Sequence, residues 1–405
     1  MLEDFELSID NFEGEDLEYF NELNSEFSGA DESLGLDRLQ SVCIEEFSKK
    51  ANSHDDFLNP RIREKLSLDL AIPQDELELL GLQFFQEELS GLRCVIDRAI
   101  DLEDWFSIID ICDSLVIFFN LKTYWEDLEA TLETALNAAQ KASNKLAEAR
   151  ILNNLGHTFR LLGKAHQGIE FCLRSVDIFE QIDDLRGKSE AVYTLGYLYR
   201  SVGQWPQSIA NFEECLSLFE RFKDFVGKAS ALDGLGQVYT KQNDFISAKK
   251  TLESSLQLKE KLKDRFQISI TCNNLGKVYL QEGDLDAAES LFKRSLVIKQ
   301  EIDDMQGQGV SFNELGEIYR RKGDFDQAMD YYSESLKVKD QISASSNSGL
   351  ADNHGKGLTF MRIGLLYKDQ DDIMSAVSYW QKALDTLNNY SPEYKRVESW
   401  IQQHQ

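Results

Sequence analysis

The sequence predicts an all-α fold, a right-handed α-solenoid (superhelix) of stacked helix-turn-helix units. The first observation behind this prediction is a Leu-Gly dipeptide that recurs every forty residues, as Leu155-Gly156, Leu195-Gly196, Leu235-Gly236, Leu275-Gly276 and Leu315-Gly316. The second is an aromatic residue three places after each glycine, namely Phe159, Tyr199, Tyr239, Tyr279 and Tyr319. Strict self-similarity at such a period is the signature of a repeat architecture.

A third observation concerns the ends of the first helix in each unit. Four units carry a glycine at the end of this helix and two carry a substitute, as Gly163, Gly203, Gly283, Gly323, Asn243 and Asp371. These residue types tolerate the left-handed conformation that closes a helix. We therefore expect a second helix to follow each of them, with the glycine of Leu-Gly allowing that helix to pack closely. Asp184, Asp224, Asp264 and Asp304 mark the junctions to the next unit.

The predicted organisation has four parts. Residues 1–59 form an acidic, largely disordered N-terminal segment, 60–103 a helical N-terminal cap, 104–388 seven repeat units, and 389–405 a C-terminal capping helix. The first unit is degenerate, since Val116 takes the place of the glycine. The last follows an insertion within 343–355, because Ile363-Gly364 comes 48 residues after Leu315-Gly316. The insertion is either a binding element or a loop that takes no part in binding.

Composition restricts the classes of partner. The net charge of −28 argues against a nucleic-acid backbone or an anionic membrane as the main partner. The sequence has no run of eighteen apolar residues, so we expect no membrane insertion. The acidic start does not resemble a secretory signal, so we expect a cytoplasmic protein. Six scattered cysteines without a CxxC pair predict reduced, buried thiols. No catalytic, metal-binding or cofactor-binding pattern stands out, which favours a non-enzymatic protein.

The segment before residue 60 is strongly acidic. Residues 1–60 hold 17 acidic and 3 basic residues, with aromatic residues interleaved. Such a composition is typical of a disordered chain that folds on a partner. Three interpretations remain open: a solubilising tail, a partner-binding segment, and an autoinhibitor that contacts the rest of the chain.

The candidate binding residues lie beside Leu-Gly on the face of each first helix that avoids the second helix. They are Asn153, Asn154, His157, Arg160, Tyr193, Tyr197, Arg200, Gln237, Lys241, Asn273, Asn274, Lys277, Asn313, Arg320, Arg321 and Lys368. A basic residue recurs four places after the glycine at positions 160, 200, 320 and 368, which predicts a basic stripe suited to carboxylates. The alternative is that these residues complement the dipoles at the helix ends.

The stretch Leu315–Ala328, LGEIYRRKGDFDQA, resembles the tetratricopeptide repeat. The forty-residue period is longer than the usual thirty-four of that family. It is similar to the long repeats of kinesin light chains, the Pins-type mitotic scaffold and many bacterial repeat proteins. The resemblance implies a solenoid whose concave face binds peptides, and it implies that Asn154 and Asn274 hold the main chain of an extended peptide.

The predicted function is that of an adaptor or scaffold. It would bind an extended, acidic segment of a partner protein in its concave groove, with the acidic N-terminus as a candidate autoinhibitor. Two alternatives are a peptide-controlled bacterial regulator of a signalling protein and an assembly chaperone for a multiprotein complex. In the bacterial regulators that the repeats resemble, an N-terminal helical bundle acts on the signalling protein, and residues 60–103 are short for such a bundle.

Overall fold

A computed structural model of the chain describes residues 32–59, 74–345, 353–387 and 391–404. These ranges contain seventeen α-helices and no strand, which confirms the predicted all-α class. Among the helices described, none is both long and apolar enough to cross a membrane. The chain divides into two compact units, Met1–Gln207 (unit 1) and Ser208–Gln405 (unit 2). Residues 1–31, the start of the predicted cap and residues 346–352 of the predicted insertion lie outside the described ranges.

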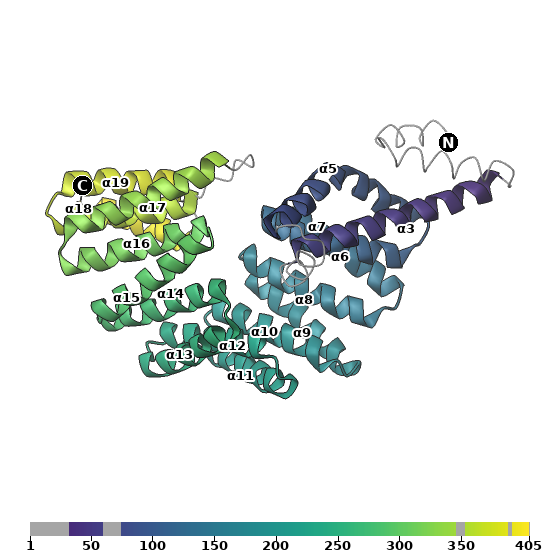
Figure 1. The fold of residues 1–405 in the computed structure, drawn as a ribbon, viewed down its shortest axis with the longest axis horizontal. Coiled ribbons are helices and arrows are strands. Elements are labelled where there is room, and N and C mark those ends of the chain that lie inside the picture. The colour runs from purple at the N-terminus through teal and green to yellow at the C-terminus, as the bar shows by residue number, and fades with distance from the viewer. Residues whose placement is uncertain (1–31, 60–73, 346–352, 388–390, 405) are drawn as a thin grey trace. The chain divides into compact units, whose positions relative to one another are not determined.

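Unit 1 begins with two long helices that precede the repeats (Figure 1). Its helices are α3 (Glu32–Leu58), α5 (Gln74–Asp101), α6 (Trp105–Lys122), α7 (Trp125–Lys141), α8 (Lys145–Leu161), α9 (Ala165–Gln181) and α10 (Leu185–Ser201). Consecutive helices pack against each other from α5 to α10, and α8 also contacts α10. The core runs from α3 to α8 and includes Phe85, Phe118 and Leu132.

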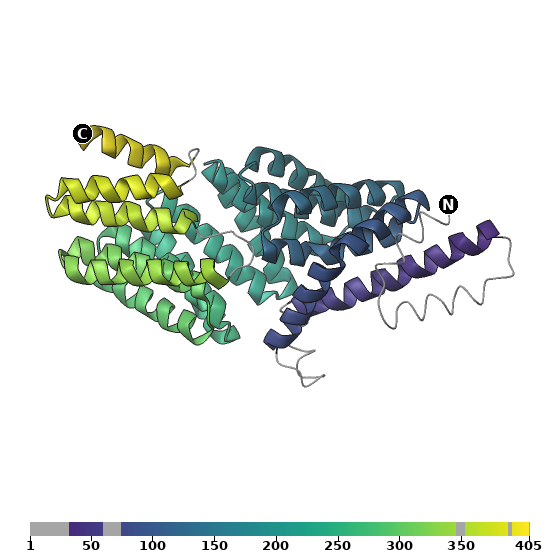
Figure 2. The ribbon, with the colours of Figure 1, turned by 90° about the horizontal axis from the view of Figure 1, so that it is seen from above.

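Unit 2 continues the alternation of first and second helices (Figure 2). Its helices are α11 (Trp205–Phe222, which begins just before the division), α12 (Phe225–Lys241), α13 (Phe245–Leu262), α14 (Arg265–Glu282), α15 (Leu285–Glu301), α16 (Met305–Lys322), α17 (Phe325–Ser345), α18 (Asn353–Asp369), α19 (Ile373–Thr386) and α20 (Pro392–His404). From α12 to α20 each helix packs on the next, and α12 contacts α14 as α16 contacts α18.

The N-terminal part differs from the prediction. The second half of the predicted disordered segment is helix α3, which packs on α5 and α6. Its residues Ile44, Ala51 and Leu58 are spaced seven residues apart and are buried, so α3 has the apolar stripe that an ordered helix needs. Within the predicted cap, the described residues form one helix, α5. The high acidic content of this segment favoured a prediction of disorder although the apolar stripe of α3 was present in the sequence.

Close packing at the Leu-Gly glycine holds the two helices of a repeat together. A Cβ atom at Gly156 would lie 2.1 Å from Cys172 Sγ of the following helix. The same construction at Gly316 would place it 2.5 Å from the ring of Tyr332. Any larger residue at these positions would push the helices apart, as the sequence predicted.

Both kinds of turn use the left-handed conformation. The predicted glycines close the first helices with positive φ angles, and Asn243 and Asp371 adopt φ angles of 60° and 62° in the same place. The turns after the second helices use non-glycine residues such as Asp183, Lys223 and Asp303, with φ between 54° and 57°. The aspartates predicted to mark the junctions follow these residues and cap the next helix, accepting hydrogen bonds from backbone N–H groups.

A buried serine ties the two helices of four repeats. Ser175, Ser255, Ser295 and Ser335 each donate a hydrogen bond of 2.7–2.8 Å to a main-chain carbonyl 26 residues earlier. The four acceptors recur at the same repeat position, on α8, α12, α14 and α16. Each bond satisfies a buried hydroxyl without an acidic partner.

A buried lysine appears at one repeat position in unit 2. Lys259, Lys299 and Lys339 are only 2–3% exposed, whereas Phe179 and Phe219 occupy this position on α9 and α11. Lys259 Nζ lies 2.5 Å from Asp233 Oδ2. Lys299 Nζ instead donates to Ser311 Oγ at 3.0 Å and to the Gly307 carbonyl at 3.2 Å. Burial lowers the pKa of Lys299 to about 8.

The first prediction concerns Lys299. We expect Lys299→Met to raise the free energy of unfolding by about 1–2 kcal/mol at pH 7, because an apolar residue removes a buried charge that forms no ion pair with a described carboxylate. The folded-state pKa of about 8 lies below the ordinary value of 10.5. The wild type should therefore gain stability relative to the variant as the pH rises from about 8 to about 10.5. Thermal melting followed by circular dichroism measures both effects.

Lys259→Met is the matched control for this prediction. It leaves the Asp233 carboxylate buried without its ion-pair partner, so it should lower the free energy of unfolding by about 3 kcal/mol. Equal shifts in the two variants would contradict the distinction between a balanced and an unbalanced buried lysine.

The second prediction concerns the docking of α3. Burial, and then the charges of Asp56 and Asp113, raise the pKa of Asp55 from 3.8 to about 7, and Asp55 Oδ1 is buried without a hydrogen-bond partner. Docking should therefore weaken as the pH rises from about 4 to about 7 and stay weak above it. Asp55→Asn should slow amide exchange across residues 44–58 at pH 8 by about tenfold, and less at pH 5. The exposed Glu45→Gln should change neither rate.

Candidate partner-binding surface

The predicted binding residues lie on the first helix of each repeat, in two sets. Those numbered 153 to 200 belong to unit 1, and those from 237 to 368 to unit 2. His157, Lys241 and Arg321 are exposed, whereas Asn273 and Asn313 are buried. The remainder are half-buried, namely Asn153, Asn154, Arg160, Tyr193, Tyr197, Arg200, Gln237, Asn274, Lys277, Arg320 and Lys368.

In unit 1 the structure brings two arginines to one tyrosine ring. The Cζ atom of Arg160, on α8, lies 5.8 Å from the centre of the Tyr197 ring of α10. The Cζ atom of Arg200, one turn further along α10, lies 4.8 Å from the same centre. Tyr193 precedes Tyr197 by one turn, and its hydroxyl donates to the Tyr197 hydroxyl at 3.2 Å. We call these four residues and His157 the arginine–tyrosine cluster.

The cluster is a region of positive charge with low solvation. Burial lowers the pKa of Arg160 and of Arg200, and the charge of Arg160 lowers the pKa of Arg200 further. The His157 side chain reaches solvent. The desolvation of its ring by the surrounding protein, and secondly the positive charge of Arg160, lower its pKa to about 4. A neutral His157 can accept the hydrogen bond from Arg160, whose Nη2 atom lies 3.0 Å from His157 Nε2. The cluster can therefore attract an anion.

In unit 2 the predicted arginines are engaged within the protein. Arg320 and Arg321 both bind Glu317, with Arg320 Nη2 at 2.9 Å and Arg321 Nε at 2.7 Å from Oε1. Arg320 also pairs with Asp369. Although burial opposes the effect, hydrogen bonds from the two arginines lower the pKa of Glu317 to about 2. This finding corrects the predicted basic stripe, since Arg320 and Arg321 are already neutralised.

A further ion pair in unit 2 was not predicted from the sequence. Arg362 Nη2 of α18 lies 3.1 Å from Glu314 Oε2 of α16, and its Nη1 donates to the carbonyl of Asn313 at 2.7 Å. Although burial opposes both shifts, the pair raises the pKa of Arg362 and lowers that of Glu314. Both residues directly precede the Leu-Gly or Ile-Gly dipeptide. Opposite charges at one repeat position of neighbouring units were the signal available.

Buried polar residues also occupy the position two places before the leucine of Leu-Gly. Asp233, Asn273 and Asn313 are each at most 7% exposed, so Asn273 and Asn313 are not open to a partner as the sequence predicted. Their side chains lie between packed helices, where Ser311 Oγ donates to Asn273 Oδ1 at 3.4 Å. Asp233 Oδ1, Asn313 Oδ1 and the Nδ2 atom of the neighbouring Asn274 are buried without a hydrogen-bond partner.

The repeats themselves match a known family. The family model described as tetratricopeptide repeat matches residues 148–221, 188–261 and 267–341. Over these residues the chain contains tetratricopeptide repeats. No curated protein matches its sequence.

Solved structures resemble these tetratricopeptide repeats at low sequence identity. A Rap protein solved in complex with the competence and sporulation factor shares 13% identity at a TM-score of 0.54, over 90% of this chain and 99% of that one. BtubC from P. vanneervenii shares 19% identity at a TM-score of 0.47, over 59% and 92% of the two chains. The repeats of a putative kinesin light chain from Podosopora anserina share 15% identity at a TM-score of 0.41, over 48% of this chain and 96% of that one. The Rap likeness shows the fold alone.

The third prediction tests the pair of Arg362 and Glu314 between α18 and α16 of unit 2. Arg362→Met should lower the free energy of unfolding by about 3–5 kcal/mol, because it leaves the Glu314 carboxylate buried without a counter-charge. Adding Glu314→Gln should recover at least half of that loss. Urea denaturation measures both variants. Arg321→Met removes an exposed arginine and leaves Glu317 paired with Arg320, so it should cost less than about 1 kcal/mol, and a loss similar to that of Arg362→Met would argue against the role of burial.

Proposed function

We propose that this chain is a non-enzymatic adaptor that binds an extended, acidic segment of a partner protein, with the arginine–tyrosine cluster as its charged contact. The observation that supports this most is the convergence of Arg160 and Arg200 on the ring of Tyr197. A carboxylate placed between two partly desolvated guanidinium groups would gain charge-assisted hydrogen bonds. It would also relieve the repulsion that lowers the pKa of Arg200.

The two helices offer matched rows for an extended peptide. Asn153, His157 and Arg160 stand at spacings of four and three on α8, and Tyr193, Tyr197 and Arg200 repeat this pattern on α10, in contact with α8. Each row spans about two turns, or roughly 10 Å, the length of about three residues of an extended chain. Half-buried Asn153 and Asn154 can donate to and accept from a peptide main chain whatever its side chains.

We assign the specificity to unit 1. In unit 2, the half-buried or exposed lysines Lys241, Lys277 and Lys368 remain as candidates for a second contact with a longer partner. The Rap protein that shares this fold binds the competence and sporulation factor. A ligand held by repeats of this kind is therefore compatible with the proposal.

The fourth prediction tests this function directly. Labelled twelve-residue peptides of acidic, neutral and basic composition are titrated into the full chain at 0.15 M salt and followed by fluorescence anisotropy. We expect the acidic set to bind most tightly, and Arg160→Glu/Arg200→Glu to weaken it by at least about tenfold through like-charge repulsion. Lys49→Glu/Lys337→Glu, with the same charge change on exposed sites of α3 and α17, should weaken it less than about twofold.

Two results would count against the proposal. Equal weakening by both double variants would mean that only the net charge matters. Equal affinity for acidic and neutral peptides would mean that the cluster does not select its ligand by charge. Circular dichroism of the Arg160→Glu/Arg200→Glu variant must match the wild type for the comparison to hold.

We also propose that the acidic N-terminus competes for the cluster. Residues 1–31 hold 11 acidic residues and no lysine or arginine. Because tethering gives a segment a high effective concentration, its removal should tighten the binding of an acidic peptide by about fivefold or more. The deletion should end at residue 31, since α3 carries buried residues from Ile44 onward. An unchanged affinity at low and high salt would exclude autoinhibition.

A second candidate function is the regulation of a signalling protein through the helices before the repeats. Helices α3 and α5, of 27 and 28 residues, pack with α6 into a bundle longer than the sequence predicted. Leu79 on α5 and Phe106 on α6 are each 63% exposed. Under this alternative, Leu79→Glu/Phe106→Glu would abolish co-purification of one protein partner from cells, and Arg160→Glu/Arg200→Glu would leave it intact.

A further inference from the structure

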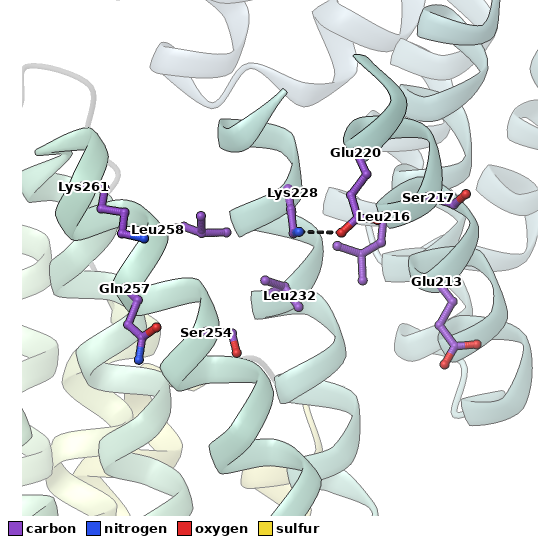
Figure 3. A pocket seen from close by; sticks show the side chains of 10 residues that line it. All are labelled: Glu213, Leu216, Ser217, Glu220, Lys228, Leu232, Ser254, Gln257, Leu258 and Lys261. Atoms are coloured by element: carbon purple, nitrogen blue, oxygen red, sulfur yellow. Dashed lines mark hydrogen bonds and ion pairs between the residues drawn. The ribbon is translucent and has the colours of Figure 1, made fainter. Parts of the chain in front are cut away.

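One hollow in the protein shares no residue with the arginine–tyrosine cluster. It is a groove of about 550 Å³ in unit 2, between the neighbouring second helices α11 and α13 and above α12 (Figure 3). Leu216, Leu232 and Leu258 form its floor. Its polar rim consists of Glu213, Ser217, Glu220, Lys228, Ser254, Gln257 and Lys261.

A single small residue explains why this groove is open. Forty residues after Ser254, the equivalent position on α15 holds Arg294, which spans to Glu260 of α13 at 2.6 Å. Glu260 in turn corresponds to Glu220 on α11. The α13–α15 boundary is therefore bridged by an ion pair, and the α11–α13 boundary lacks the arginine that would bridge it. There Glu220 pairs with Lys228 of α12.

The walls of the groove have helical spacing and charged ends. Glu213, Leu216 and Glu220 follow one face of α11 over two turns, and Ser254, Leu258 and Lys261 do the same on α13. The floor is thus a leucine surface about 10 Å long. Glu213 lies at one end of it, and the lysines of α12 and α13 lie at the other with Glu220 (Figure 3).

We propose that this groove is the docking site for an amphipathic helix of another protein, running antiparallel to α11 and α13. Apolar side chains at positions i, i+3 or i+4, and i+7 of that helix would cover the leucine floor. Helices favour acidic residues near the N-terminus and basic residues near the C-terminus. In the antiparallel direction, the acidic first turn meets Lys228 and Lys261, and the basic last turn meets Glu213.

Charge argues against a second copy of this chain as the occupant. Each copy carries a net charge of −28, so two copies repel each other over long distances. A separate partner that presents a short helix with both signs of charge has no such penalty. The groove lies in unit 2 and shares no residue with the arginine–tyrosine cluster, so the two proposals can fail separately.

The test is a selection of helical peptides displayed on phage against the full chain, followed by binding measurements with synthetic peptides. Ser254→Arg rebuilds the bridge of the next repeat, with Glu220 as its partner. Ser254→Met fills the groove without adding charge. Ser333→Arg, the same change as the first on an exposed site of α17, is the matched control. Melting curves and circular dichroism establish that each variant folds.

The expected result is an enriched set of peptides with the i, i+3/i+4, i+7 apolar pattern, acidic first turns and basic last turns. Their affinity should fall at least about tenfold in Ser254→Arg and in Ser254→Met and stay within about twofold in Ser333→Arg. Glu213→Lys should weaken them about fivefold, and peptides whose basic last turn is replaced by an acidic one should recover part of that loss.

Three outcomes would overturn the proposal. Peptides that bind both Ser254 variants as tightly as the wild type would place their site elsewhere. An enriched set without the helical apolar pattern would exclude a helix as the occupant. A concentration-dependent dimer of the wild type that Ser254→Arg abolishes, seen by light scattering after size-exclusion chromatography, would assign the groove to a second copy of the chain.

Discussion

The close contact at the Leu-Gly glycine is the constraint on which each repeat depends. It brings the second helix so near that the facing side chain occupies the volume of a missing Cβ atom. That facing residue differs in size between repeats, for example Cys172, Leu252, Phe292, Tyr332 and Trp380. The glycine therefore packs against facing side chains of different size, because only the residue on the second helix changes from one repeat to the next. The buried serine bonds and the lysine position follow from the spacing that it sets.

Features that depend on a few neighbouring residues could be predicted from the sequence. The turn at Gly163, the cap at Asp224 and the packing at Gly316 each follow from local backbone chemistry. The buried Lys299 could not be predicted in this way, since lysine is almost always exposed and its environment is made by other helices. An alignment of the repeats would have shown that Phe179 and Phe219 hold the same position. Helix α3 escaped prediction because its acidic composition outweighed a weak apolar stripe.

The candidate site was predicted only in part, for a reason that the residue after each Leu-Gly glycine makes plain. In the repeat that carries Arg320 and Arg321 this residue is Glu317, which stands three and four positions before them and binds both. In unit 1 it is His157 or Tyr197, and neither carries a negative charge at neutral pH. The prediction of a basic stripe considered the arginines but not the acidic residue one turn before them. The same repeat position thus holds an arginine that binds a carboxylate in one unit and an arginine that contacts a tyrosine ring in the other.

The serine bonds also bear on how the chain acquires its structure. Each closes a loop of only 26 residues, and the loop has the same length in all four repeats. The entropy lost in closing such a loop is small and does not grow with the length of the whole chain. A repeat can therefore complete its own tertiary bond before the next repeat has been synthesised. Folding of this long chain becomes a succession of short steps, in which each new repeat covers the apolar face left open by the one before it.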